Sequence, residues 1–201
     1  MAKQTDSKAT DSKTPDSKTP AASAAPLTRA ELAAMIRVNH AGEYGAVRIY
    51  QGQWELMRRT RKGARLARAT RTMAAQEERH REWFAEELRA HGIAPSALLP
   101  LWHRLGFALG VGTALLGPHA AHACTEAVEE VIDEHYRRQL EALPPRRAPR
   151  VRAKIARAHK EELEHRDYAR AEGAAEAPAY KLLHAVITTG CRLAIAASSR
   201  L

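Results

Sequence analysis

One short pattern recurs in two distant parts of this chain: a glutamate followed three residues later by a histidine. It occurs as Glu77 with His80 and as Glu162 with His165. In an α-helix this spacing puts both side chains on one face. On a helical wheel each pair shares its face with apolar side chains such as Phe84. Burying an ionised carboxylate in a protein core costs free energy unless a partner offsets its charge. The pattern therefore predicts that both Glu-x-x-His pairs face the core and that a partner there offsets the charge of their carboxylates.

Each pair is preceded by one further glutamate that also faces the core. Glu43 stands 34 residues before the first pair, and Glu129 stands 33 residues before the second. On the wheel Glu129 lies about 60° from Ile132, whereas Glu130 lies about 160° away and faces water. The chain therefore reads as two helical hairpins, each offering one Glu and one Glu-x-x-His. Four carboxylates and two imidazoles in a bundle core are the ligand set of a di-iron or di-manganese site.

The remaining pattern is helical from Leu27 onward, in a chain rich in Arg and Ala with only 5% aromatic residues. Thr28 followed by Glu31 is a capping box that starts the first helix. We expect helices at about 28–60, 63–91, 121–142 and 149–171, an apolar segment at 97–117, and a last apolar stretch at 182–197. Four helices with one long apolar crossover between the second and third predict an all-α, ferritin-like four-helix bundle.

The N-terminal part differs in composition from the rest. Residues 5–19 repeat with a period of five, and residues 1–26 contain too few apolar side chains to pack. We expect 1–26 to be a disordered tail and 27–201 to form one domain. The tail has no arginine, and its aspartates balance its lysines, which argues against a mitochondrial transit peptide. Two cysteines in 201 residues indicate a reducing compartment.

Charge alone leaves the partner open. Lys and Arg number 32 against 23 Asp and Glu, a formal net charge of +9, with basic runs at 58–71 and 146–157. Nucleic acid, an anionic membrane surface or neither would fit this charge. Residues 98–116 are apolar, but their dense part, 105–117, is too short to span a bilayer. This segment predicts peripheral membrane contact, with a crossover helix packed on the bundle as the alternative.

Several stretches resemble the demethoxyubiquinone hydroxylase (Coq7) family of ubiquinone biosynthesis. They are IRVNHAGEYGAVRIYQGQ at 36–53, PLWHRLGFALGVGTALLG at 100–117, ACTEAVEE at 123–130, EELEHRDYA at 161–169 and APAY…GCRLAI at 177–195. The resemblance covers about 27–201. It implies a membrane-associated di-iron monooxygenase that uses O2 to hydroxylate the ring of a polyprenyl demethoxyubiquinol. It also implies the six ligands that spacing gives: Glu43, Glu77, His80, Glu129, Glu162 and His165.

The resemblance carries further expectations. The family has a His-Tyr pair near the quinone, which implies a substrate or electron-transfer role for His135 and Tyr136; a buried structural histidine is the alternative. It implies two iron ions, NADH as a proposed reductant, biosynthetic helper proteins and no nucleic acid. A Gly-x-Gly-x-x-Gly after a strand is missing. The expected location is peripheral, on the cytoplasmic side of a bacterial inner membrane. Ala196 and Ala197 stand where some members have a tyrosine.

Groups that orient the two imidazoles are also expected. Candidates are Asp167, Tyr168 and Tyr44, with His40 about 60° from Glu43 on the first helix; surface or core positions are the alternative for each. Three other functions are open. A di-iron tRNA hydroxylase would use the positive charge. An iron-storage protein would assemble into shells, and an Arg-rich nucleic-acid module would bind no metal. The tRNA hydroxylase would not need the apolar crossover, and the nucleic-acid module would leave the core-facing Glu/His pattern unexplained.

Overall fold

The structure, a computed structural model, describes residues 27–61 and 63–201, and the regular secondary structure of these residues is all helical, without a strand. The helices are α1 (Arg29–Met57), α2 (Ala64–His91), α3 (Leu99–Leu115), α4 (Pro118–Ala142), α5 (Pro149–Ala171), a short 3-10 turn η1 (Ala174–Glu176) and α6 (Tyr180–Ser198). The all-α prediction is confirmed. The tail predicted at 1–26 and Lys62 of the first basic run lie outside the described residues.

Local sequence signals set several helix ends. At the start of α1 the Thr28 hydroxyl accepts from the Glu31 amide, and the Glu31 carboxylate accepts from the Thr28 amide, so the predicted capping box is present. Gly92 ends α2 in the left-handed conformation with φ +64°, which only glycine adopts without strain. Both α4 and α5 begin with a proline in the first turn, where its missing N–H leaves no bond unmade.

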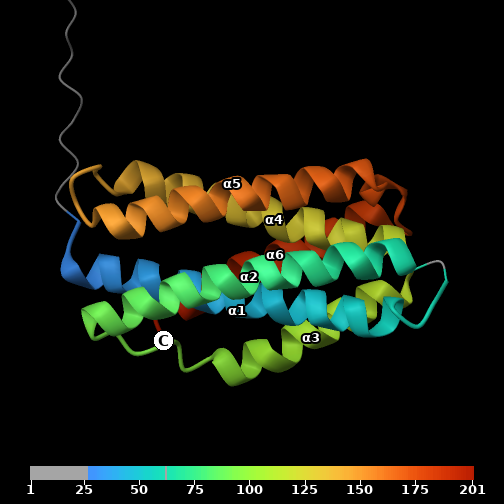
Figure 1. Cartoon of the computed structure of the whole chain (residues 1–201), viewed down its shortest axis with the longest axis horizontal. Helices are drawn as coiled ribbons and strands as arrows, with labels where there is room; N and C mark the ends of the chain where they lie inside the picture. The colour runs from blue at the N-terminus through green and yellow to red at the C-terminus, as the bar shows by residue number, and fades with distance from the viewer. Residues whose placement is uncertain (1–26, 62) are drawn as a thin grey trace, which may run out of the picture.

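The helices form two hairpins that lie against each other. In Figure 1, α1 and α2 make one antiparallel pair and α4 and α5 make the other, with the two pairs stacked along their length. The predicted crossover, α3, packs on the outer side of α1, and α6 packs on α4. The chain thus has the four-helix core expected, plus two further helices on one side of it.

Helix α3 approaches α1 backbone to backbone. A Cβ at Gly106 would lie 2.8 Å from the Gly45 carbonyl oxygen, and Cβ atoms at Gly110 and Gly52 would collide with backbone atoms of the opposite helix. Such small residues let two helices approach more closely than side chains allow. The glycines of α3 and α1 therefore allow the crossover helix to pack directly against the backbone of α1.

The apolar core leaves the middle of the bundle to polar groups. A cluster that includes Ile36, Phe84, Leu143 and Ile155 fills one end of the bundle, and a cluster around Met57 and Leu66 joins α1 to α2 toward the other. Four buried glutamates, each at most 4% exposed, lie together between the hairpins: Glu43, Glu77, Glu129 and Glu162. Burying several carboxylates costs free energy unless nearby groups offset their charges, and the neighbours of these four glutamates include two histidines.

Candidate metal centre

The structure brings all six predicted ligands together between the hairpins. Glu43 comes from α1, Glu77 and His80 from α2, Glu129 from α4, and Glu162 and His165 from α5. They form two overlapping sets: Glu43, Glu77, His80 and Glu162, and Glu77, Glu129, Glu162 and His165. Within each set one potential ligand atom per residue lies within 4.8 Å of the others. Glu77 and Glu162 belong to both sets, so two cations bound here would share them.

Both histidines turn the same ring nitrogen toward the carboxylates. His80 Nδ1 lies 3.0 Å from Glu162 Oε1 and 3.5 Å from Glu43 Oε2. His165 Nδ1 lies 3.0 Å from Glu77 Oε1 and 3.1 Å from Glu162 Oε2. The i, i+3 spacing places each histidine on the same helix face as its own glutamate, and the two faces meet between the hairpins.

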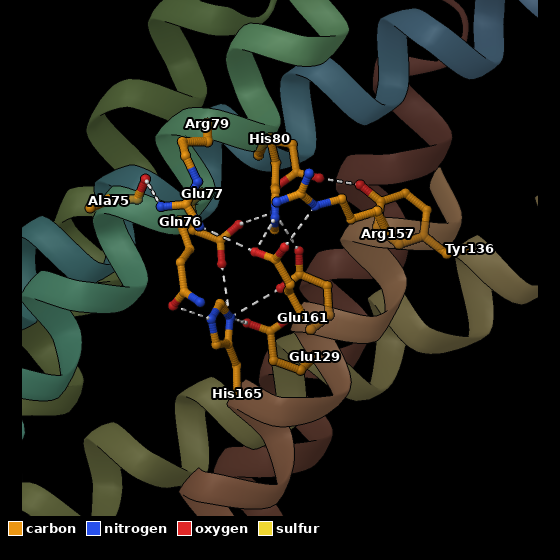
Figure 2. A network of polar contacts seen from close by, with 12 residues as sticks. Ala75, Gln76, Glu77, Arg79, His80, Glu129, Tyr136, Arg157, Glu161 and His165 are labelled. Carbon is orange, nitrogen blue, oxygen red and sulfur yellow. Dashed lines mark hydrogen bonds and ion pairs between the residues drawn. The ribbon is translucent and has the colours of Figure 1, made fainter. Parts of the chain in front are cut away.

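The outward nitrogen of each histidine meets a residue of the opposite hairpin. His80 Nε2 lies 3.1 Å from Glu161 Oε2, and His165 Nε2 lies 3.0 Å from Gln76 Oε1, as Figure 2 shows. A proton on Nε2 would donate to these oxygens and leave Nδ1 as an acceptor or ligand. The two contacts therefore favour the tautomer that a metal site needs.

Two tyrosines hold the single glutamates. The Tyr136 hydroxyl of α4 donates to Glu43 of α1, and the Tyr50 hydroxyl of α1 donates to Glu129 Oε1 of α4 at 2.6 Å. Each hydrogen bond crosses from one hairpin to the other. The carboxylates are thus oriented before any cation arrives.

Burial and crowding shift the pKa values of the centre. Burial raises the pKa of Glu43 to about 7, with Glu77 adding to this and His80 opposing it. Burial and the charges of Glu162 and Glu77 raise the pKa of Glu129 well above its usual range. Burial opposes the charged form of His165, but its contacts with Glu162 and Glu77 raise its pKa to about 11. Burial thus favours the protonated form of the two carboxyl groups, and the nearby carboxylates favour the protonated form of His165.

Three buried atoms of the centre lack a hydrogen-bond partner: Glu77 Oε1, His80 Nδ1 and Glu162 Oε1. Their neighbours lie at ion-pair distance but without hydrogen-bond geometry. A polar atom left so in a core is costly. Bound cations would satisfy these atoms, because carboxylate oxygens and imidazole nitrogens suit iron or manganese. The residues present therefore fit a pair of such ions.

His135 and Tyr136 lie beside the centre in different ways. Tyr136 is buried and contacts Glu43, whereas His135 Nε2 lies 3.1 Å from Asn39 Oδ1 and also contacts Gln139. Burial lowers the pKa of His135 to about 4. The predicted substrate or electron-transfer role of the pair stays a prediction, with Tyr136 the nearer of the two to the ligand set.

The candidates for orienting the imidazoles lie elsewhere. Asp167 pairs with Arg166 at the surface. The Tyr168 ring packs edge-on against His122, and the Tyr44 hydroxyl lies 2.6 Å from His103 Nδ1 of α3. His40 is buried, its Nδ1 lacks a partner, and burial lowers its pKa to about 4. None of these residues contacts His80 or His165 in the described part of the chain.

The sequence prediction missed Gln76, Glu161 and Tyr50. A signal was present in each case. Gln76 and Glu161 directly precede the first glutamate of the two Glu-x-x-His pairs. Tyr50 follows Glu43 by seven residues, as Tyr136 follows Glu129. All three stand at the same spacing from a candidate ligand in both hairpins. A search for positions that recur at a fixed spacing from the ligands would have found them.

An apolar cavity of about 330 Å³ lies between α1, α3, α4 and α6. Its lining includes Ile49, Val128, Trp102, Leu105, Ile187 and Cys191. Ile49 and Val128 directly precede Tyr50 and Glu129 in the chain. The cavity therefore reaches from the outer helices to the backbone that carries the centre.

Two helical hairpins that enclose carboxylates and imidazoles in a buried cluster define the class of ferritin-like, carboxylate-rich metal proteins. A comparison with protein-family models identifies the family within this class. Residues 30–198 match the model of the family described as "Ubiquinone biosynthesis protein COQ7", and the chain belongs to this family. The resemblance inferred from the sequence motifs is thereby confirmed.

Curated relatives cover most of the chain. A protein of Rhodospirillum rubrum named 3-demethoxyubiquinol 3-hydroxylase is 48% identical over 165 residues, 82% of this chain and 76% of its own. A human protein named NADPH-dependent 3-demethoxyubiquinone 3-hydroxylase, mitochondrial, is 44% identical over 178 residues, 87% of this chain and 80% of its own. A Saccharomyces cerevisiae protein named 5-demethoxyubiquinone hydroxylase, mitochondrial, is 35% identical over 181 residues, 83% of this chain and 77% of its own.

Among the described residues no helix is long and apolar enough to cross a bilayer.

Proposed function

We propose that this chain is a di-iron monooxygenase that uses O2 to hydroxylate the ring of a polyprenyl demethoxyubiquinol, a 3-demethoxyubiquinol 3-hydroxylase. The observation that carries the proposal is the pair of overlapping, buried Glu/His sets with three unsatisfied atoms aimed into them. Membership of the family and the hydroxylase names of the relatives support this activity. No observation favours a tRNA hydroxylase, an iron-storage protein or a metal-free nucleic-acid module.

The six residues that would hold the iron are Glu43, Glu77, His80, Glu129, Glu162 and His165. Iron bound there would supply the redox chemistry that activates O2. The chain's own residues prepare the site. Tyr50 and Tyr136 orient the single glutamates. Gln76 and Glu161 hold a proton on the outward nitrogen of each histidine. Apolar side chains at the ends of the bundle keep water from the carboxylates.

The apolar cavity is the proposed entrance for the quinol. It is lined almost entirely by apolar side chains, which suits a prenyl chain and the quinol ring. It adjoins Ile49 and Val128, so a ring at its inner end would lie near Tyr50 and Glu129. His135 and Tyr136 are proposed to act on the substrate or on electron transfer.

The proposed membrane contact is made by 98–116, extended by α6. Leu101, Leu105, Leu115 and Leu116 of the segment are 45–69% exposed. Leu182, Val186 and Leu193 of α6 are 61–67% exposed. Exposed apolar side chains on two helices that flank one apolar cavity suit a lipid surface. The proposed location stays the cytoplasmic side of a bacterial inner membrane.

The reductant is proposed to be a nicotinamide cofactor. The family resemblance implies NADH, whereas the human and Bos taurus relatives are named as NADPH-dependent enzymes. A test must therefore offer both, together with a chemical reductant. Biosynthetic helper proteins remain a prediction.

The direct test is hydroxylation of a demethoxyubiquinol by purified protein loaded with ferrous iron. We expect about two irons per chain and a hydroxylated product that requires O2. Glu129→Ala and His165→Ala should abolish the product and the full two-iron loading, because each removes a ligand of one metal position. Glu130→Ala is the matched control, because Glu130 directly follows Glu129 but pairs with Arg170 and His184 at the surface. Iron that binds in full, with no product from any of the three reductants, would contradict the proposal.

A further inference from the structure

The two halves of the centre come from the two helical hairpins, each of which supplies one single Glu and one Glu-x-x-His pair. Most contacts of the centre are the same in both halves. Each set of candidate ligands contains three glutamates and one histidine. Each single glutamate accepts a hydrogen bond from a tyrosine of the opposite hairpin, Glu43 from Tyr136 and Glu129 from Tyr50. Ligand type and tyrosine contacts therefore make no distinction between the two metal positions.

The repeat is broken behind the histidines. His80 Nε2 faces the carboxylate of Glu161, whereas His165 Nε2 faces the neutral amide of Gln76, at 3.1 and 3.0 Å (Figure 2). Glu161 directly precedes Glu162, and Gln76 directly precedes Glu77. The same position of the repeat thus carries a charged group in one hairpin and an uncharged group in the other.

This difference changes the histidine as a ligand. A hydrogen bond to a carboxylate is about twice as strong as one to a neutral oxygen. It draws the Nε2 proton away from the ring and raises the basicity of Nδ1, which strengthens binding of a cation there. His80 Nδ1 is therefore the better donor of the two.

Two arginines oppose this effect without removing it. Arg79 lies 3.4 Å from Glu161 Oε2, and Arg157 lies 3.3 Å from Glu161 Oε1. Their side chains are 49% and 66% exposed, so water and salt screen their charges. Glu161 itself is only 15% exposed and lies against the imidazole. The nearby carboxylate outweighs the screened arginines at the histidine.

We propose that the two metal positions are unequal, and that the position of His80 binds a divalent cation more tightly than the position of His165. Glu161 and Gln76 are the positioning residues that set this order. The inference rests on the proposed function, since it needs a two-metal centre. It adds that the two positions fill in sequence, with the Glu43 side of the centre first.

The test uses Zn²⁺ as the probe and the ring-nitrogen NMR signals of the histidines as the readout. In the full-length protein the first equivalent of Zn²⁺ should shift the His80 signal and leave the His165 signal in place. The second equivalent should then shift His165. We expect the two affinities to differ by about 10-fold or more, the usual effect of such an outer partner.

Exchange of the two outer residues gives the decisive variants. Glu161→Gln should lower affinity at the His80 position by about 10-fold and remove the preference. The double variant Gln76→Glu with Glu161→Gln should reverse the order, so that His165 shifts first. Repulsion between the two cations also separates two binding steps, but it does not reverse on this exchange. Glu164→Gln, at an exposed site on the same helix, is the matched control and should change nothing.

The outcomes separate the two proposals. Equal shifts of both histidines at one equivalent, or an unchanged order in a double variant whose helix content is that of the wild type, would overturn the inference and leave the metal centre standing. If no histidine signal moves with Zn²⁺, iron or manganese, the proposed metal centre fails and the inference fails with it.

Discussion

Two faces of α1 meet their partners in opposite ways. The face with Glu43 and Tyr50 reaches across to α4 through long polar side chains and buried charge. The face with Gly45 and Gly52 touches α3 with no side chain between the backbones. The first contact leaves buried polar atoms without a hydrogen-bond partner, whereas the second is a close packing of two backbones. Metal, pH and side-chain volume should therefore act on the two faces separately.

The largest effect is expected from a ligand shared by both metal positions. Glu162→Ala should empty both, with a loss of affinity greater than the 10–100-fold typical of an outer partner. Glu43→Ala should empty one position only, because Glu43 belongs to one set. Metal content after dialysis, measured by elemental analysis, distinguishes these results. Glu164→Ala on the same helix should keep both metals.

The second prediction acts on the glycine face. Gly110→Leu puts a side chain into the backbone of α1 at Ile49 and should destabilise the fold by about 3 kcal/mol or more, since the opposing atoms are backbone and cannot move aside. Gly112→Leu is the matched control, because the space around Gly112 is open. Thermal unfolding of both variants tests the difference. Equal stability of the two would mean that α3 is not held by this contact.

The third prediction concerns pH and separates the faces again. The pKa of Glu43 is raised to about 7 in the metal-free fold, so the folded chain holds more protons than the unfolded chain between its ordinary pKa of 4.5 and 7. Stability should therefore fall as pH rises through this window, by about 1 kcal/mol per pH unit. His165, with its pKa raised to about 11, adds stability that is complete below 6.5 and lost as pH rises toward 11.

Metal should reverse this trend. Cations displace the protons from the carboxylates and imidazoles, so metal-loaded protein should gain stability as pH rises through the same range. Urea midpoints of both forms at several pH values provide the measurement. In Glu43→Gln the fall between 4.5 and 7 should shrink. A metal-free wild type whose stability rises with pH in that window would contradict the assigned direction.

A feature of this fold can be predicted from the sequence when the residues that make it lie close together along the chain. The four core helices and the clustering of the six candidate ligands were predictable, because i, i+3 spacing and helical periodicity are local properties of the chain. The contacts of Gln76, Glu161 and Tyr50 cross between hairpins and depend on how the hairpins face each other. The apolar segment at 97–117 was recognised by composition, but its attachment through Gly106 and Gly110 depends on a backbone approach that no local pattern encodes.

The smallest effect is expected from the two tyrosines of α1, which lie on its two faces. Tyr50 donates to Glu129 in the centre, whereas Tyr44 contacts His103 of α3. Tyr50→Phe removes one buried hydrogen bond, so it should reduce stability by about 1 kcal/mol and weaken metal binding by up to about 10-fold. Tyr44→Phe should leave metal affinity unchanged, because its partner, His103, belongs to α3 and not to the set of candidate ligands. Zn²⁺ titration of both variants measures the contrast, and equal losses of affinity would mean that the two faces of α1 are coupled through the helix rather than independent.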